Sequence, residues 1–140
     1  MKEELITFET AKLAKEIGFD ENTNEFYTTA GNLTGVMYYD PTPNNRTIDT
    51  EWFSVLEKES QAYCTAPIQS LLQRWLREKH YIQINIFAEW NKKRNKITFC
   101  NYIISLDENM AGLHYVMSGF DTYEEALEAG LLEALKLIKT

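Results

Sequence analysis

Residues 66–86, APIQSLLQRWLREKHYIQINI, change from one spacing of apolar side chains to another, and this change indicates the fold. In the first half the apolar residues recur at helical spacing, at Ile68, Leu71, Leu72, Trp75 and Leu76. This spacing predicts an amphipathic helix. Pro67 suits its first turn, because the first N–H groups of a helix have no partner within it. From Tyr81 onward apolar and polar residues alternate, which predicts a strand with one buried face.

The helical pattern places Trp75 inward and the two nearby arginines outward. At about 100° per residue, Arg74 lies about 100° from Trp75 around the helix, and Arg77 lies near the back. Burying a large apolar side chain is worth about 1.5–3 kcal/mol, which is a sufficient reason for a tryptophan here. We therefore interpret Trp75 as a core residue rather than as an exposed surface for stacking bases.

Three strands are expected after this helix. The alternation over residues 81–90 predicts one buried face, formed by Ile82, Ile84, Ile86, Ala88 and Trp90. A polar turn is expected at residues 91–96, followed by a second strand at 97–106. After another turn at 107–112, a short third strand is expected at 113–117.

The last helix has the clearest start signal in the chain. Thr122 and Glu125 form a T-x-x-E capping box. The apolar ridge that follows consists of Tyr123, Leu127, Leu131, Leu135 and Ile138. Beside this ridge lies Gly130, which costs about 1 kcal/mol of helix propensity relative to alanine, so we expect a close approach of the helix backbone to the sheet. Leu132 points to the opposite face and is a candidate contact with a partner.

The N-terminal half gives weaker patterns. Thr7 is expected to cap a first helix that ends at Gly18. The next segments are interpreted as a loose hairpin with strands at 25–29 and 35–39, a loop at 40–45 and a short helix at 51–59.

These elements predict one α+β domain over residues 1–140. The expected architecture is a single antiparallel β-sheet with helices packed on it, with the C-terminal half in α-β-β-β-α order. A chain of 140 residues buries roughly two-thirds of its unfolded surface, so it needs no metal or disulfide to fold.

The charge is unevenly distributed. The formal net charge is −7, which disfavours non-specific attraction to nucleic acid or anionic lipid. Between Arg74 and Lys96, however, seven basic residues and two acidic ones give a local charge of +5, so the remainder carries −12. The sequence therefore predicts a basic patch on an acidic body.

Two negative observations concern location. The first residues, MKEELITFET, lack the apolar core of a signal peptide, and no apolar stretch approaches the roughly 20 residues that a membrane helix needs. The two cysteines, Cys64 and Cys100, have neither the spacing of a metal motif nor that of a disulfide scaffold. We expect a cytoplasmic protein with no membrane association.

Three segments carry a resemblance to a known family. APIQSLLQRWLRE at 66–78, TYEEALEAGLLEALKLI at 122–138 and FETAKLAKEIGFD at 8–20 resemble an uncharacterised family of small phage and mobile-element proteins from Bacteroidetes-type bacteria. The chain is similar, more loosely, to small α/β sandwich domains of other phage proteins. Members of the family often have threonine where Ile68 stands. The resemblance implies a phage or prophage accessory protein in a bacterial cytoplasm, and it implies no mechanism.

The sequence shows no convincing catalytic, cofactor-binding or metal-binding constellation. Cys64 and His80 lie at opposite ends of one predicted helix, about 18 Å apart. Cys100 and His114 lie on neighbouring predicted strands and are a candidate dyad, although a buried thiol and a core histidine explain them equally well. Glu124 and Glu128 share a helix face without a histidine at ligand spacing. Paired carboxylates from separate segments stay an open alternative, and they would require a concave pocket with titratable walls.

The α-β-β-β-α order is also that of double-stranded RNA-binding domains. In such domains the final helix begins with basic residues that contact phosphates. Here that helix begins Thr122-Tyr123-Glu124-Glu125, which repels phosphate. An acidic protein that imitates DNA is a further alternative, but the acidic residues are spread over at least three predicted helices.

The leading expectation is a non-enzymatic accessory protein that binds another protein. It is motivated by the negative charge, by the eight tyrosines and three tryptophans, and by the lack of a catalytic constellation. The alternative is contact with nucleic acid through the basic segment 74–96. Its candidate residues are Arg74, Arg77, Lys92, Lys93, Arg94 and Lys96.

Overall fold

The computed structural model describes residues 3–35, 44–45, 62–106, 112 and 114–139. Contacts divide the chain into two compact units. One comprises Leu5–Ile68, and the other comprises Met1–Glu4 with Gln69–Thr140. Three predicted segments lie wholly or partly outside the described residues: residues 36–39 of the predicted hairpin strand at 35–39, residues 40–43 of the predicted loop at 40–45, and the predicted helix at 51–59.

The first unit begins with helix α1, Phe8–Ile17, whose predicted ends are confirmed. The hydroxyl oxygen of Thr7 accepts a hydrogen bond of 3.4 Å from the N–H of Thr10. At the other end Gly18 takes a left-handed conformation with φ of 106°, and its N–H bonds to the carbonyl oxygens of Ala14 and Lys15. Such a conformation suits glycine, which has no Cβ to clash with the backbone.

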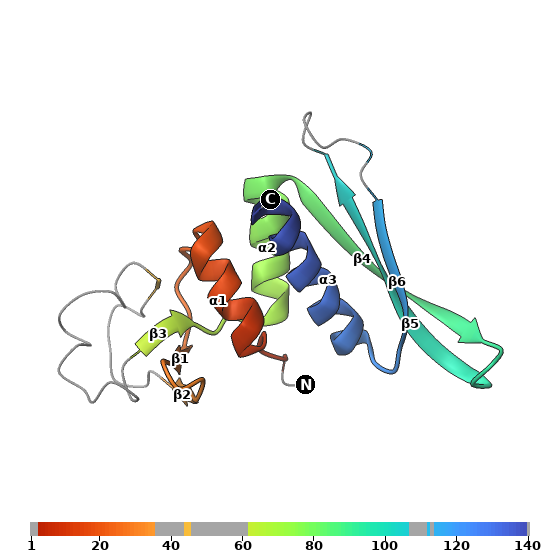
Figure 1. Cartoon of the computed structure of the whole chain (residues 1–140), viewed down its shortest axis with the longest axis horizontal. Helices are drawn as coiled ribbons and strands as arrows, with labels where there is room; N and C mark the ends of the chain where they lie inside the picture. The colour runs from red at the N-terminus through yellow and green to blue at the C-terminus, as the bar shows by residue number, and fades with distance from the viewer. Residues whose placement is uncertain (1–2, 36–43, 46–61, 107–111, 113, 140) are drawn as a thin grey trace. The chain divides into compact units, whose positions relative to one another are not determined.

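The first unit also holds a small antiparallel sheet in the order β2-β1-β3 (Figure 1). Its strands are β1 Glu25–Thr28, β2 Leu33–Gly35 and β3 Ala62–Thr65. The predicted hairpin is present, but its second strand begins earlier than expected, because Thr28 bonds to Asn32 and closes a tight turn. The core of this unit includes Ile6, Ala11, Ala14, Phe19, Phe26 and Cys64.

The second unit contains helix α2, Gln69–His80, and helix α3, Tyr123–Lys139, with a sheet in the order β4-β5-β6. Its strands are β4 Ile82–Asn91, β5 Lys96–Ser105 and β6 His114–Phe120. All of these strands pair antiparallel, and β4 pairs with β5 along its whole length. The helices α2 and α3 lie on one face of this sheet (Figure 1).

The expectation of a single sheet is wrong, because the strands form two separate three-stranded sheets. Within the described part of the chain, β1 pairs with β2 and β3, β5 pairs with β4 and β6, and no strand pairing joins the two sets. The α+β class is confirmed. The predicted α-β-β-β-α order for the C-terminal half also needs correction: α2 begins before the midpoint of the chain, and the order after α2 is β-β-β-α.

The predicted helix over residues 66–78 begins later than Pro67 suggested. Ile68 forms an isolated antiparallel bridge with Leu5, and the carbonyl oxygen of Pro67 accepts a 3.0 Å bond from the N–H of Ile6. These bonds keep the residues before Gln69 extended. The predicted inward face is confirmed at Trp75, which is 4% exposed.

The predicted start of α3 is confirmed with one difference. The hydroxyl oxygen of Thr122 accepts a 3.1 Å bond from the N–H of Glu125. The Glu125 carboxylate bonds to the N–H of Asp121, at 3.3 Å, rather than to that of Thr122. Further along α3, Gly130 approaches the sheet as predicted: a Cβ at this position would lie 2.9 Å from Cγ2 of Ile84. No helix of the described residues is long and apolar enough to cross a membrane.

Candidate binding surface on the β4–β5 hairpin

The strand β4 extends beyond the helices that cover its first half. Ile82 and Ile84 are each 1% exposed, whereas the side chains from Phe87 to Trp90 are all exposed. The predicted burial of Ala88 and Trp90 is therefore wrong. The alternation along the strand gives the correct face, but neither α2 nor α3 lies over that face near the turn (Figure 1).

Apolar residues are exposed on both faces of this overhanging hairpin. Trp90 pairs across the strands with Ile97, and the two side chains are 59% and 58% exposed. By alternation they belong to the face that carries Ile84. Phe87, which is 53% exposed, lies on the opposite face. We call Phe87, Ala88, Trp90 and Ile97 the hairpin patch.

The outer edge of β4 near the turn carries backbone groups that point away from the sheet. The N–H of Leu106 donates a 2.8 Å bond to the carbonyl oxygen of Tyr81, so this pair is a hydrogen-bonded pair. Bonded and non-bonded pairs alternate along an antiparallel ladder. The residues whose N–H and C=O face outward are therefore Ile82, Ile84, Ile86, Ala88 and Trp90.

One hydrogen bond from α2 confirms this assignment. The side-chain amide of Gln73 donates a 2.9 Å bond to the carbonyl oxygen of Ile84, which must therefore face outward. Beyond Ile84, no bond within the described part of the chain reaches the outward groups of Ile86, Ala88 and Trp90. We call the segment 86–90 the open edge.

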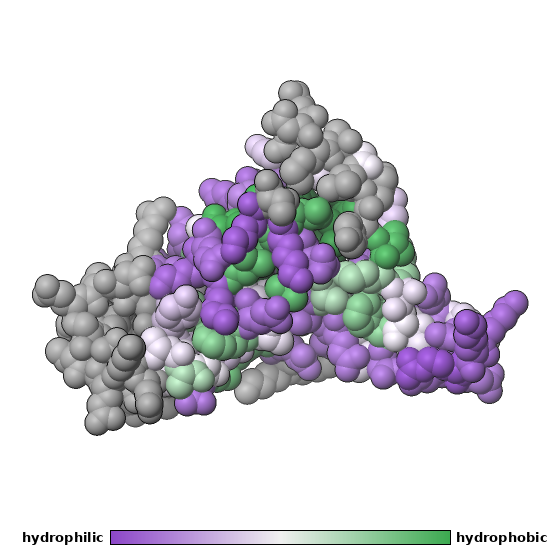
Figure 2. Space-filling model, viewed as in Figure 1, coloured by the Kyte–Doolittle hydropathy of each residue, from purple (hydrophilic) through white to green (hydrophobic). Residues whose placement is uncertain are grey.

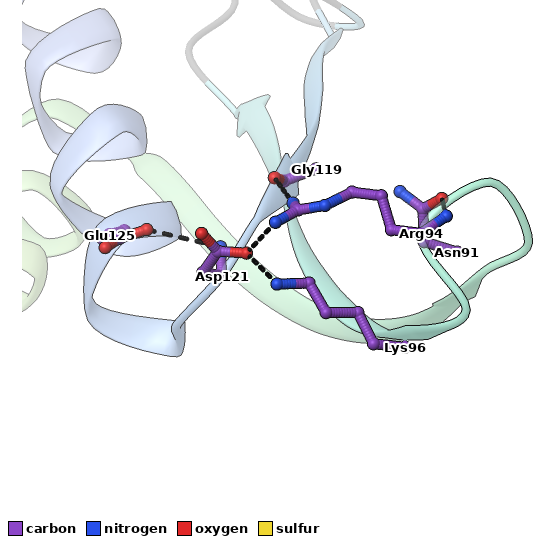
Figure 3. Close-up of polar contacts among 6 residues, drawn as sticks. All are labelled: Asn91, Arg94, Lys96, Gly119, Asp121 and Glu125. Carbon is purple, nitrogen blue, oxygen red and sulfur yellow. Dashed lines mark hydrogen bonds and ion pairs between the residues drawn. The ribbon is translucent and has the colours of Figure 1, made fainter.

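The turn at the end of the hairpin is held by polar contacts (Figure 3). The N–H of Arg94 donates a 3.1 Å bond to Oδ1 of Asn91, and Asn95 has a positive φ of 52°. The Asp121 carboxylate lies 2.6 Å from the Arg94 guanidinium and 2.7 Å from the Lys96 ammonium. Hydrogen bonds from Lys96 and then Arg94 lower the pKa of the Asp121 carboxyl below its usual value.

The six predicted nucleic-acid contacts fall into two groups. Arg74 and Arg77 are exposed on α2, whose C-terminus leads directly into β4. The other four lie in or next to the turn, where Figure 2 shows a gathering of hydrophilic residues: Lys92, Lys93, Arg94 and Lys96. The strand between the groups is ten residues long, or about 33 Å. The basic segment is thus continuous in sequence but does not form one continuous patch.

The remaining sequence candidates are scattered. Leu132, the candidate partner contact, is half-buried on α3. His114 pairs with Ile104, four residues from Cys100, so the register separates the backbones of the candidate dyad by about 13 Å. His80 packs edge-on against Trp75 with ring centroids 4.8 Å apart, and burial lowers its pKa.

A depression of about 240 Å³ lies between the first turns of α2 and α3. Its walls carry the carboxylates of Glu3, Glu4 and Glu124. The hydroxyl of Ser70 donates to the Glu3 carboxylate at 2.9 Å, and the Gln69 amide donates to the Glu124 carbonyl oxygen at 3.0 Å. Among the described residues, no three His, Cys, Asp or Glu side chains come together in a way that could hold a metal ion.

Comparisons with family models, with curated proteins and with solved structures found no match. The hairpin patch and the open edge therefore rest on geometry alone. Sequence patterns missed both, although element lengths contain a signal. A ten-residue strand spans about 33 Å, whereas the twelve-residue α2 spans about 18 Å, so α2 cannot cover the strand to its end.

Proposed function

We propose that the protein acts by binding another protein, without catalysis of its own, and that the hairpin patch is the contact surface. The observation that supports this most is the exposure of Trp90, Ile97 and Phe87, each more than half exposed on one projecting hairpin. Single exposed apolar residues are common on soluble proteins. Neighbouring ones that include a tryptophan, as in the cross-strand pair of Trp90 and Ile97, are typical of the centre of a binding surface.

The composition of the patch also favours a protein partner. Interface cores are enriched in aromatic residues and depleted in charge, and the patch has two aromatic residues and no charged one. The resemblance of residues 66–78 and 122–138 to small phage proteins supports a phage or prophage accessory role, exercised in a bacterial cytoplasm.

Copurification tests the proposal. Two tagged proteins would be expressed in the natural host: the wild type and the double variant Trp90→Ala, Ile97→Ser. Each protein that they capture would then be purified and titrated against the wild type and against the double variant. We expect a partner that binds the wild type and binds the variant at least tenfold more weakly, which corresponds to about 1.4 kcal/mol. Leu33→Ala is the matched control, because Leu33 is also exposed, at 49%, but lies in the first unit. Equal binding by wild type and double variant would remove the patch as the contact surface.

A second candidate is contact with single-stranded nucleic acid at the turn. Lys92 and Lys93 are exposed there, close in sequence to the exposed indole of Trp90, and stacking on an aromatic ring combined with nearby cations suits single strands. Against it, Asp121 pairs with both Arg94 and Lys96. Retention on immobilised single-stranded DNA tests it. Lys92→Glu with Lys93→Glu should then reduce retention, and Asp121→Asn should increase it. If retention does not change in either variant and does not depend on salt concentration, this candidate is rejected.

A further inference from the structure

The open edge of β4 indicates how a protein partner would bind. We propose that the partner contributes an extended segment that adds as a further strand to β4 along residues 86–90, and that this segment is acidic where it passes the turn. This inference rests on the proposed function and specifies the chemistry of the partner.

The first argument is the hydrogen-bonding capacity of the edge, which no described residue uses from Ile86 to Trp90. Ile86, Ala88 and Trp90 each direct one N–H and one C=O outward, and an added strand pairs with groups of this kind. The edge is regular here, since β4 pairs with β5 without a bulge. Toward the start of β4 the site is limited, because the Gln73 amide already donates to the carbonyl oxygen of Ile84.

The opposite edge of the sheet is a poorer site. The pairing of β5 with β6 shifts between Phe99 and Asn101, and Gly119 nearby has a φ of 87°. An irregularity of this kind bends a strand and interrupts its edge. The carbonyl oxygen of Gly119 also accepts a 3.2 Å bond from Arg94. Strand addition is therefore expected at β4 rather than at β6.

The second argument is that one added strand explains exposed apolar groups on both faces. Trp90 lies on the face that carries the helices, and Phe87 lies on the other. A helix or a flat surface docked on one face would leave the other side chain in water. The side chains of an extended segment alternate between the two faces, so the same segment contacts Trp90 with one residue and Phe87 with the next.

The third argument is charge. Lys92 and Lys93 are exposed in the turn, whereas the protein as a whole carries −7. A segment that continues past Trp90 meets these two ammonium groups, and carboxylates there are attracted. Lysines also serve to keep sheet edges soluble, but they do so on the strand itself. Here the three outward positions of the open edge carry no charge.

A library of random peptides displayed on yeast supplies a probe for this site. Peptides enriched on the full-length protein would be synthesised and titrated by fluorescence polarisation. We expect extended sequences with apolar residues on both alternating faces and acidic residues at one end. Ala88→Pro removes an outward N–H that the folded sheet does not use, and should weaken binding about tenfold or more. Ala88→Val changes the same side chain but keeps that N–H, so Ala88→Pro should bind well below Ala88→Val, and the difference between the two variants reports on the N–H itself.

Amide hydrogen exchange supplies a readout that does not depend on a variant. Saturating peptide should slow exchange at Ile86, Ala88 and Trp90, whereas the inward N–H groups of Phe87 and Glu89 are protected from the start. If no peptide is enriched, strand addition is rejected. Peptides that bind through Trp90 could leave exchange at the three outward N–H groups as fast as in the unbound protein, and could bind Ala88→Pro as tightly as the wild type. In that case strand addition is wrong and the proposed function stands.

Two further outcomes separate the alternatives. If binding survives Trp90→Ala with Ile97→Ser as well, the hairpin patch itself is not the contact and the proposed function fails at this surface. In the absence of peptide, exchange at the three outward N–H groups could already be slow, and sedimentation could give twice the mass of one chain. The occupant would then be a second copy of this chain. That result overturns the assignment of an acidic partner.

Discussion

The side-chain amide of Gln73 donates a 2.9 Å hydrogen bond to the carbonyl oxygen of Ile84, on the outer edge of β4. This bond marks the point where α2 stops covering the strand. On the helix side the carbonyl oxygen of Ile84 has this partner, and the side chains of Ile82 and Ile84 are each 1% exposed. On the turn side the edge carries outward backbone groups and exposed apolar side chains, and these are the features from which we infer binding.

The two described tryptophans should respond differently to substitution. Trp75 is 4% exposed and Trp90 is 59% exposed. Trp75→Ala should lower the free energy of unfolding by about 3–5 kcal/mol, because it leaves a large cavity. Trp90→Ala should lower it by about 1 kcal/mol or less, the scale of one cross-strand pair. Urea unfolding of the two variants measures both values. Similar losses would contradict the assigned burial.

Gly130→Ala should destabilise the protein although alanine is the better helix former. The added methyl group would lie 2.9 Å from Cγ2 of Ile84, and relieving such crowding in a core costs about 1–3 kcal/mol. Over most of this range the cost exceeds the gain of about 1 kcal/mol in helix propensity. Ile84→Ala removes the crowding atom, so in that background Gly130→Ala should be harmless or stabilising. A double-mutant cycle with no coupling would show that the two residues do not touch.

Asn45 and Asn44 form a matched pair in the first unit. The Asn45 amide donates a 2.8 Å bond to the carbonyl oxygen of Phe19, and its Oδ1 accepts a 2.9 Å bond from the N–H of Thr65. Asn45→Ala leaves these two backbone groups without that partner and should cost about 2–4 kcal/mol. Asn44 is half-buried with an exposed bond to Asn22, so Asn44→Ala should cost about 1 kcal/mol or less. Thermal unfolding of both variants compares them, and equal losses would count against the Asn45 bridge.

The stability of the protein should fall at alkaline pH because of Cys64. Burial, opposed by Lys15 and Lys12, raises the pKa of this thiol to about 12, against an ordinary value of 9.0. The unfolded chain therefore loses this proton first as the pH rises. The contribution of the neutral thiol is complete below pH 9 and is lost between pH 9 and 12.

Between about pH 8 and about pH 10 this loss amounts to about 1.4 kcal/mol in the free energy of unfolding. Cys64→Ala retains every other titrating group. The difference between the two proteins in the pH dependence of the free energy of unfolding is therefore the contribution of the thiol. Parallel curves for the two proteins would mean that the thiol is accessible to water.

Local patterns in the sequence predicted part of the fold well. The helical spacing around Trp75, the capping box at Thr122 and the small residue at Gly130 each depend on neighbours within one or two helical turns. Their physical causes are therefore contained in short stretches of sequence. The structure confirms the buried face at Trp75, the N-cap at Thr122 and the close approach at Gly130.

The errors came from contacts between distant segments. Alternation gave the correct face for Trp90, but its burial depends on where α2 and α3 end over the sheet. The separation into two sheets depends on which strands pair, and the paired residues of β1 and β3 are 34 to 39 positions apart in the sequence. The pairing of Asp121 with Arg94 and Lys96 likewise joins segments 25 to 27 residues apart. No local pattern encodes such contacts.

Amide hydrogen exchange along β4 of the unbound protein tests the central claim most directly. The account predicts alternation: fast exchange at Ile86, Ala88 and Trp90, and slow exchange at Phe87 and Glu89, whose N–H groups bond to β5. Uniformly slow exchange from residue 86 to residue 90 would show that another part of the protein already covers this edge. It would contradict the proposal that a partner strand binds there.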